Sequence, residues 1–365
     1  MAAPDSAPDL HCPTCGNEYA DRWRCACGAP LDYEQPLPEA DDPADADLDL
    51  TRGLWAFSEF LPVDPRVTLG EGPTPLVDAP GWDAAFKLDW TLPSGSFKDR
   101  GATAVLSRAA ELGVDRVVED SSGNAGAAIA TYAARAGIDC AVYVPASVKP
   151  GKLRAIERAG ATVERVEGSR ADVTDACVDA VEAGEGWYAS HAWNPYFFAG
   201  TATMAYELAW QRDWSVPDAV VLPLGHGTMF LGAYRGFRAL RDAGWTDAMP
   251  RLLGAQAAGY APIVAELHGA DAAAGDNDAA DGIQIRDPVR FEEITDAVAA
   301  TDGDAIALDA DAVERELDAL SRAGFYVEPT CAVAPAALRE YRERGVLAPD
   351  ADVVVGLSGS GLKTG

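Results

Sequence analysis

Lysine is scarce in this sequence, and long apolar runs are lacking. Only five lysines occur among its 29 basic residues, against 58 aspartates and glutamates, which gives a formal net charge of −29. A negative field of this size repels phosphate backbones and argues against nucleic acid as a main partner. A lysine-poor, acid-rich composition is typical of proteins from salt-loving organisms, where high salt screens the repulsion between acidic groups.

The lack of long apolar runs argues against a membrane-spanning helix. No stretch approaches the roughly 18 consecutive apolar residues that such a helix needs, and residues 1–10 contain neither a basic region nor an apolar core. We therefore expect neither a membrane span nor a signal peptide. The seven cysteines form a group of four and three scattered singles, which indicates a metal site plus buried thiols rather than a disulfide framework. A reducing, cytoplasmic location is expected.

The four grouped cysteines form two knuckles, and a glycine directly follows each knuckle. They are Cys12, Cys15, Cys25 and Cys27. Four thiolates close a tetrahedral site, and so short a segment buries too little core to fold without a metal. The pattern predicts a zinc ribbon over residues 1–35, with His11 as a competing ligand. The zinc is expected to be structural, because four cysteines leave no open position, and activity is expected to survive loss of the ribbon.

Beyond the ribbon, residues 36–50 are rich in Pro, Asp and Ala and are expected to be a disordered acidic linker. From residue 115 onward, short apolar stretches alternate with alanine-rich helical segments, which predicts an α/β fold with parallel sheets. We expect two α/β lobes. The small lobe would comprise residues 106–197, and the large lobe residues 51–105 and 198–365. Strands are expected at 116–119, 140–144, 162–166, 219–223 and 353–357, and a further one at 86–90 before a helix at 102–112.

The candidate catalytic residue is Lys98, which lies in the run from Ser94 to Gly101. A lysine forms Schiff bases, and it becomes a usable nucleophile or base when partial burial lowers its pKa. The alternative is a solvated lysine on the first turn of a helix. Downstream glycine-rich loops favour the functional interpretation.

Two such loops lie between an expected strand and an expected helix, where backbone N–H groups and the helix dipole bind anions. The first consists of Ser121, Ser122, Gly123 and Asn124, and it suits a substrate carboxylate. The second consists of Gly225, His226, Gly227 and Thr228, and it suits a phosphate. Either loop alone is no more than a helix cap with a glycine turn. Together with Lys98 and the terminal turn at 358–361, they favour a pyridoxal phosphate (PLP) site.

Four runs together resemble threonine synthase and its relatives among the fold-type II PLP enzymes, the tryptophan synthase β-like group. They are residues 96–101, 122–124, 194–196 and 359–363. The likeness covers about residues 50–365. It implies that the cofactor lies in a cleft between two α/β lobes, and some members of the family also carry an N-terminal zinc ribbon. A homo-oligomer, in the form of a dimer, is expected.

The resemblance also implies a role for each cofactor residue. Lys98 would carry the cofactor covalently, Asn124 would bond its 3′-oxygen, and residues 225–228 would hold its 5′-phosphate. Ser358 would face the pyridine nitrogen, where a neutral hydroxyl leaves that nitrogen largely unprotonated and suits eliminations more than transamination. The expected substrate ligands are Ser121, Ser122, Gly123, His191 and Asn194.

The sequence departs from the family at the substrate-phosphate site. Threonine synthases usually read Asn-Ser-x-Asn-Pro-x-Arg, where this chain has His191, Ala192 and Phe197 in place of Asn, Ser and Arg. An arginine clamp and a hydroxyl donor are therefore missing, and only His191 could still donate. His226 likewise replaces an asparagine, as a phosphate partner or as a loop residue.

The resulting hypothesis is a PLP-dependent lyase of the threonine synthase-like group that acts on a small amino acid. Weak turnover of O-phosphohomoserine is expected, unless Arg100, Lys363 or His226 restores the clamp. The first alternative is a serine or threonine dehydratase, which needs no phosphate clamp. The second is a non-catalytic protein that binds a partner through the zinc ribbon, and the intact Lys98 and Asn124 weigh against it.

Overall fold

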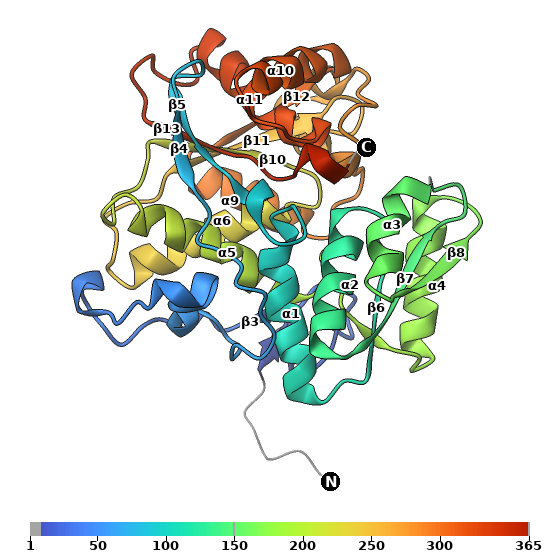
Figure 1. Cartoon of the computed structure of the whole chain (residues 1–365). Coiled ribbons are helices and arrows are strands. Elements are labelled where there is room, and N and C mark those ends of the chain that lie inside the picture. Colours follow the sequence, from blue (N-terminus) through green and yellow to red (C-terminus); the bar gives the residue numbers. More distant parts are fainter. Residues whose placement is uncertain (1–8, 149, 364–365) are drawn as a thin grey trace.

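The computed structural model describes residues 9–148 and 150–363, so residues 1–8 of the expected ribbon lie outside the described residues. The described chain contains a six-stranded sheet, a four-stranded sheet and a small three-stranded sheet near the N-terminus. In Figure 1 the six-stranded sheet and its helices form the upper part, and the four-stranded sheet stands to the right. The two large sheets agree with the expected α/β fold, and the bounds of the two lobes stay a prediction.

The six-stranded sheet has the order β12-β11-β10-β13-β5-β4 and is parallel except for the pairing of β4 with β5. Its strands are β4 (Leu76–Ala79), β5 (Ala84–Lys87), β10 (Ala219–Pro223), β11 (Arg251–Ala257), β12 (Asp304–Leu308) and β13 (Val353–Gly356). Its helices are α5 (Pro195–Trp210), α6 (Thr228–Asp242), α7 (Pro262–His268), α8 (Ala270–Ala273), α9 (Phe291–Ala300), α10 (Ala310–Arg322) and α11 (Pro329–Glu343).

Strand β10 illustrates why both faces of this sheet are buried. Successive side chains of a strand point to opposite faces. Val220 and Leu222 belong to the cluster with α5 and α6, whereas Ala219 and Val221 belong to the cluster with α10 and α11. A strand that is buried on both faces has a continuous apolar sequence, and the apolar run at 219–223 predicted this strand.

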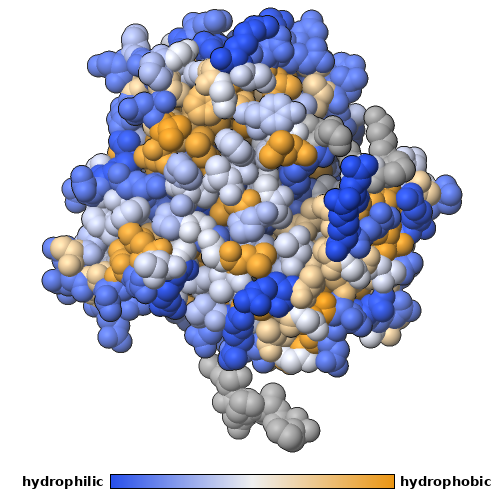
Figure 2. All heavy atoms as spheres, in the orientation of Figure 1, coloured by the Kyte–Doolittle hydropathy of each residue, from blue (hydrophilic) through white to orange (hydrophobic). Residues whose placement is uncertain are grey.

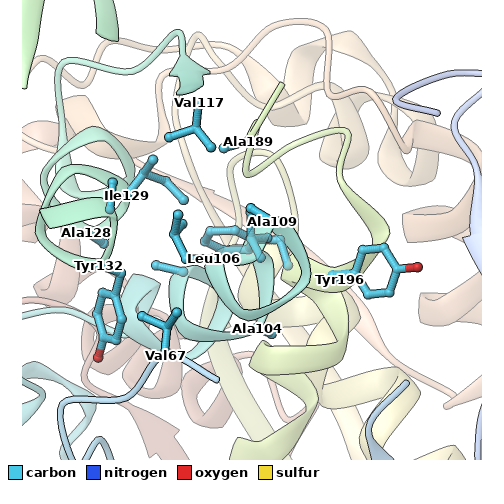
Figure 3. Packing of buried hydrophobic residues seen from close by; sticks show 14 of the residues in the cluster. Val67, Ala104, Leu106, Ala109, Val117, Ala128, Ile129, Tyr132, Ala189 and Tyr196 are labelled. Carbon is cyan, nitrogen blue, oxygen red and sulfur yellow. The ribbon is translucent and has the colours of Figure 1, made fainter. Parts of the chain in front are cut away.

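The four-stranded sheet is parallel throughout, in the order β8-β7-β6-β9. Its strands are β6 (Arg116–Glu119), β7 (Asp139–Pro145), β8 (Thr162–Val166) and β9 (Trp187–Tyr188), and its neighbouring helices are α1 (Lys98–Leu112), α2 (Asn124–Ala136), α3 (Pro150–Arg158) and α4 (Arg170–Glu182). Figure 3 shows Leu106 of α1, Ile129 of α2 and Val117 of β6 meeting in one core. This core fixes α1 and α2, whose first residues are Lys98 and Asn124.

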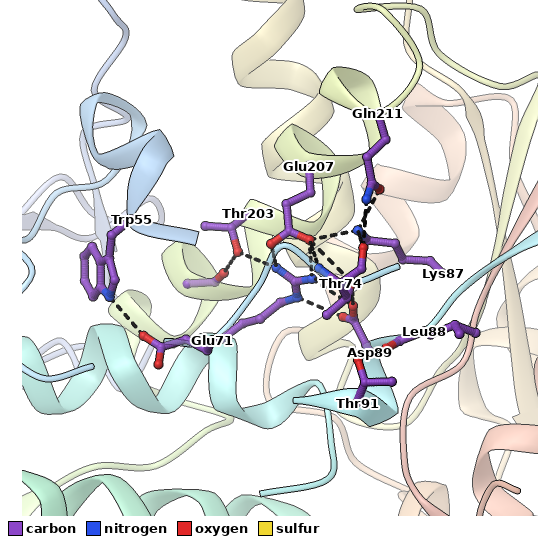
Figure 4. Close-up of polar contacts among 12 residues, drawn as sticks. Trp55, Glu71, Thr74, Lys87, Leu88, Asp89, Thr91, Thr203, Glu207 and Gln211 are labelled. Atoms are coloured by element: carbon purple, nitrogen blue, oxygen red, sulfur yellow. Dashed lines mark hydrogen bonds and ion pairs between the residues drawn. The ribbon is translucent and has the colours of Figure 1, made fainter. Parts of the chain in front are cut away.

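A buried network of charges fixes the start of α1 against the large sheet (Figure 4). Arg100 pairs with Asp89 at 2.8 Å and with Glu207 at 2.7 Å, and Lys87 pairs with Glu207 at 2.8 Å. All four side chains are fully buried. Burial raises the pKa of Glu207, but the charges of Arg100 and Lys87 outweigh this effect and lower the pKa to about 2. Glu207 therefore stays ionised at neutral pH.

The N-terminal sheet has the order β2-β1-β3, with β1 (Leu10–His11), β2 (Glu18–Tyr19) and β3 (Asp32–Tyr33). Residues 36–50, expected to be disordered, follow a defined path instead. They include a short 3-10 helix, η1 (Pro43–Asp45), and the Trp245 indole N–H donates to the Ala40 carbonyl at 2.8 Å. Apolar residues between the acids, such as Leu48, pack against the core of the six-stranded sheet and explain the difference.

Two further elements differ from the expected bounds. The strand expected at 86–90 is β5, which ends at Lys87 and is followed by the 3-10 helix η3 (Asp89–Thr91). The helix expected from residue 102 begins four residues earlier, at Lys98. The remaining short helices are η2 (Leu50–Phe60), η4 (Asp281–Ile283) and η5 (Gly361–Lys363).

The surface in Figure 2 carries hydrophilic side chains over most of its periphery, with apolar side chains in separate small patches. Among the described residues, no helix is both long enough and apolar enough to cross a membrane.

Candidate active site

A cavity of about 390 Å³ lies where residues that follow β6, β10 and β13 meet. The carboxyl ends of parallel strands are the usual place for a ligand in open α/β sheets. The cavity brings together eleven of the residues expected at the site. They are Lys98, Ser121, Ser122, Gly123, Asn124, His191, Gly225, His226, Gly227, Thr228 and Ser358.

Lys98 presents its amine to this cavity from the first turn of α1. Its Nζ donates to Thr228 Oγ1 at 2.8 Å and lies 4.7 Å from the centroid of the Phe97 ring. Burial lowers the pKa of Lys98 to about 7, with Arg170 acting in the same direction and Glu119 against it. Near neutral pH a large share of this amine is therefore uncharged and able to attack an aldehyde.

The second glycine loop joins β10 to α6 and points the first N–H groups of that helix at the cavity. Gly227 has a φ of 78°, and a Cβ atom on it would lie 2.7 Å from the Ile294 side chain. Glycine is thus required for both conformation and space. The helix N-terminus and the Thr228 hydroxyl form an anion site.

The first glycine loop joins β6 to α2 in the same way. Gly126 lets the helix approach the loop, because a Cβ atom there would lie 1.9 Å from the Ser121 carbonyl oxygen. Asn124, at the start of α2, donates from Nδ2 to Glu328 Oε1 at 2.8 Å. The loop N–H groups and the Asn124 amide therefore face one cavity, opposite the second loop.

His191, His226 and Arg170 form one wall of the cavity. The two imidazole rings lie 5.3 Å apart between centroids, His191 Nδ1 lies 2.7 Å from Glu119 Oε1, and Arg170 Nη2 lies 3.4 Å from His226 Nε2. Burial, together with nearby positive charges, lowers the pKa of both histidines well below the usual value. Both rings are therefore neutral at pH 7, and Arg170 carries the positive charge of this wall.

Ser358 closes the cavity at the end of β13. Its N–H lies 3.1 Å from Cys331 Sγ, and its carbonyl accepts from the Phe97 N–H at 2.9 Å. Burial raises the pKa of Cys331 to about 12, so this thiol is uncharged. A ligand atom that meets Ser358 faces a neutral hydroxyl.

Comparison with known proteins identifies the family. A family model described as "Pyridoxal-phosphate dependent enzyme" matches residues 67–359. The chain belongs to this family. Threonine synthase of Methanocaldococcus jannaschii is 33% identical over 373 residues, covering 96% of this chain and 92% of that protein. Threonine synthase of Methanosarcina acetivorans is 33% identical over 378 residues, covering 97% and 92%.

Among solved structures, maize serine racemase matches with a TM-score of 0.70 at 21% identity, covering 87% of this chain and 94% of that one. The fold is that of the fold-type II PLP enzymes, as the sequence predicted, and the chain is a threonine synthase-like member of the family.

The cavity of this PLP-dependent enzyme fits the cofactor chemically. It offers an amine for an aldehyde, a helix N-terminus for a phosphate and an amide for a ring oxygen. Within the described residues, His226 Nδ1 is buried without a hydrogen-bond partner. An anion at the second loop would supply a hydrogen-bond partner for His226 Nδ1. Without a partner, a buried polar atom destabilises the fold.

Asn194 is the one expected site residue that the described cavity lining does not include. Its side chain accepts from the Tyr196 N–H at 3.1 Å and caps α5. Its role as a substrate ligand stays a prediction. Of the three residues considered as replacements for the clamp, Arg100 is held in the buried network, Lys363 is absent from the described lining, and only His226 lines the cavity.

Arg170, Asp120 and Glu328 line the cavity of the enzyme and were missed in the sequence. Arg170 starts α4, which a capping box of Ser169 and Asp172 begins. That Ser-x-x-Asp pattern could have placed Arg170 at a helix start, directly after a strand. Nothing local in the sequence indicates that α4 starts beside the second glycine loop.

The four grouped cysteines of this enzyme converge as their spacing predicted. Their Sγ atoms all lie within 4.8 Å of one another, with 3.6 Å between Cys12 and Cys27 and 3.4 Å between Cys15 and Cys25. Tetrahedral zinc with Zn–S bonds of about 2.3 Å needs sulfurs about 3.8 Å apart, so the cluster fits that ion. His11 does not belong to the cluster.

Proposed function

We propose that this protein is a PLP-dependent lyase that performs elimination on a small amino acid, in the manner of threonine synthase. The observation that carries the proposal is a buried Lys98 amine, its pKa lowered to about 7, that lines one cavity with two helix N-termini. PLP, when bound, supplies an electron sink that allows the Cα–H bond and a bond to a leaving group to break. The protein supplies orientation and proton transfer.

The two loops divide the binding of anions. The N–H groups of residues 121–123 and the dipole of α2 would hold the substrate carboxylate. The second loop and the dipole of α6 would hold the cofactor phosphate. This arrangement brings the substrate Cα near Lys98, whose uncharged amine takes the proton. Thr228, 2.8 Å from Nζ, keeps the amine oriented.

The presence of Arg170 in the cavity favours a substrate with an anionic leaving group. It places a guanidinium 3.4 Å from His226 on the cavity wall, whereas Phe197 stands where the family pattern has an arginine. A charge-assisted hydrogen bond from Arg170 would replace part of the missing clamp. Together with the full-length likeness to threonine synthases, this favours a phosphate ester such as O-phosphohomoserine. We thus revise the expectation that its turnover is weak.

The second candidate is a serine or threonine dehydratase. The observation in its favour is the substitution at Ala192 and Phe197, which are buried side chains that donate no hydrogen bond. A substrate whose leaving group is hydroxide would need only the carboxylate loop and Lys98.

The experiment compares O-phosphohomoserine, serine and threonine as substrates of the purified enzyme and follows release of phosphate and of 2-oxoacid. Threonine synthase activity predicts phosphate release with threonine as the product, whereas 2-oxoacid from serine or threonine alone would identify a dehydratase. Arg170→Ala should raise the KM for O-phosphohomoserine roughly 10-fold to 100-fold, because a charge-assisted hydrogen bond contributes about 1.5 to 3 kcal/mol.

Arg158→Ala is the matched control, because this exposed arginine belongs to the same lobe and does not line the cavity. An unchanged KM in Arg170→Ala would show that Arg170 does not bind the leaving group, and it would leave the lyase assignment intact. Absence of product with every substrate would contradict that assignment.

The cysteine cluster is proposed to hold one structural zinc, which metal analysis of the purified chain checks at about one ion per chain. Four of the seven cysteines converge on a possible metal site and the other three are buried, which supports a reducing compartment such as the cytoplasm. A homodimer remains the prediction for the assembly, to be checked by light scattering.

A further inference from the structure

The segment that carries His191 is flanked by residues that pack against the cysteine ribbon. Residues 189–194 form an irregular connection between β9 and α5. The Trp23 ring of the ribbon lies 5.3 Å from the Tyr188 ring and 5.2 Å from the Trp193 ring, both nearly perpendicular to it. His191 lies between these two contact points in the sequence.

Further contacts tie the same segment to the ribbon at both ends. At the start, Trp187 donates from its indole N–H to Asp21 Oδ2 at 3.0 Å. At the end, the Tyr33 ring of β3 stacks on the Tyr196 ring at 6.4 Å. Arg290, the residue before α9, joins both parts, because its Nη2 donates to the Leu31 carbonyl at 2.7 Å and to the Trp193 carbonyl at 3.4 Å.

The ribbon also contacts helix α4, which packs on the four-stranded sheet. Arg24 stacks over the Trp23 ring at 4.3 Å and pairs with Glu182, at the end of α4, at 2.7 Å. Trp23 is therefore held by Arg24 and α4 as well as by its contacts with Tyr188 and Trp193. An irregular backbone has no ladder of hydrogen bonds to hold it, so such side-chain packing decides where it lies.

We propose that the cysteine ribbon is a positioning element of the active site, with Trp23 as the residue that holds segment 189–194 so that His191 faces the cavity. Trp23 is not among the described residues that line the cavity, and it acts through Tyr188 and Trp193. The expectation that the ribbon is dispensable for activity is replaced by this proposal. The position of segment 189–194 does not depend on which substrate the enzyme takes.

The test compares Trp23→Ala with Trp214→Ala in the full-length holoenzyme. Trp214 is half-buried like Trp23 and makes an equivalent edge contact with Trp245, at 4.8 Å and 83°, on the large sheet. Hydrogen–deuterium exchange at the Ala189 and Asn194 amides, which donate to Val118 and Ser190, reports the segment directly. Their exchange should accelerate about tenfold or more in Trp23→Ala and stay unchanged in Trp214→Ala.

A double-mutant cycle shows whether Trp23 acts through His191. Trp23→Ala should lower kcat/KM about tenfold in the wild-type background and by less than about twofold in a His191→Ala background. Additive losses, or equal exchange in the two tryptophan variants, would overturn the proposal. If Trp23→Ala fails to fold or loses zinc, Asp21→Ala removes the carboxylate that accepts from the Trp187 indole N–H, keeps both rings and must show the same pattern on a smaller scale.

Discussion

At the scale of single residues, the reactivity of Lys98 follows from where its amine is buried. A free lysine is almost wholly charged at pH 7 and cannot attack a carbonyl. Burial among Phe97, Thr228 and the loop residues removes part of that charge. The sequence predicted this lysine through the scarcity of other lysines and through the glycine-rich loops that follow it.

Lys98 is therefore expected to capture the cofactor with a pH dependence set by its own pKa. Because the uncharged amine attacks the aldehyde, the rate at which cofactor-free enzyme binds PLP should rise with pH through a midpoint of about 7. The rate is measured from the visible absorbance of the bound cofactor. Borohydride reduction and peptide mapping should then place the pyridoxyl group on Lys98, and Lys98→Ala should bind none covalently.

Lys363→Arg is the control, since Lys363 is absent from the described cavity lining, and it should behave as the wild type. A midpoint near 10, the range of an exposed lysine, or an adduct on another lysine would contradict the assignment.

Other residues show where prediction from sequence ends. The two glycine loops were predicted because the residues of each loop are consecutive in the sequence and each loop joins a strand to a helix. Arg170 was missed, because it enters the cavity only through the packing of α4 beside β6 and β7. Asn194 was expected at the substrate, and its side chain caps the first turn of α5, so its role as a substrate ligand stays a prediction.

At the scale of secondary-structure elements, the position of α1 depends on the buried charges of Arg100, Asp89, Glu207 and Lys87. Each carboxylate is fully enclosed and accepts hydrogen bonds from a cation. Removing one partner from such a set leaves a buried charge uncompensated, which costs far more than losing an exposed pair. Because α1 carries Lys98, the same network holds the reactive amine in place.

Glu207→Gln is expected to destabilise the fold by roughly 3 to 5 kcal/mol, because it leaves Lys87 and Arg100 without their shared carboxylate. Chemical denaturation gives the free energy of unfolding. Asp318→Ala is the matched control, because it removes the exposed ion pair with Arg322 and should cost at most about 0.5 kcal/mol. Equal losses in the two variants would show that the network does not hold α1.

The elements also show what the apolar pattern leaves open. Strands β6, β8 and β10 have the expected bounds. Strand β10 is a continuous apolar run, whereas β6 and β8 are short stretches in which valines stand among charged residues between turns. The order of the six-stranded sheet places β13, the last strand, between β10 and β5, and no local pattern encodes that neighbour. The ribbon was predicted from its cysteines alone. Its contact with the His191 segment depends on Trp23 and Tyr188, which lie about 165 residues apart in the sequence. Local sequence patterns give no information on a contact over such a separation.

At the scale of the whole molecule, the net charge of −29 acts against the compact fold. Acidic groups on the surface repel one another, and salt weakens this repulsion as the screening length falls from about 10 Å at 0.1 M to about 3 Å at 1 M. The buried network and the apolar cores are shielded from solvent and respond little to screening of this kind. The surface is therefore the part of this molecule whose energy depends on salt.

Stability is accordingly expected to rise with salt. Between about 0.1 M and 2 M KCl the Tm should increase by roughly 4 °C or more, because a gain of about 3 kcal/mol moves the midpoint of a protein of this size by about 1 to 2 °C per kcal/mol. Thermal unfolding followed by circular dichroism measures the shift. Sucrose at matched osmolality is the control, since it strengthens apolar burial without screening charge and should give a smaller rise. A Tm that is equal at the two KCl concentrations, or that rises as much in sucrose, would show that charge repulsion does not limit this fold.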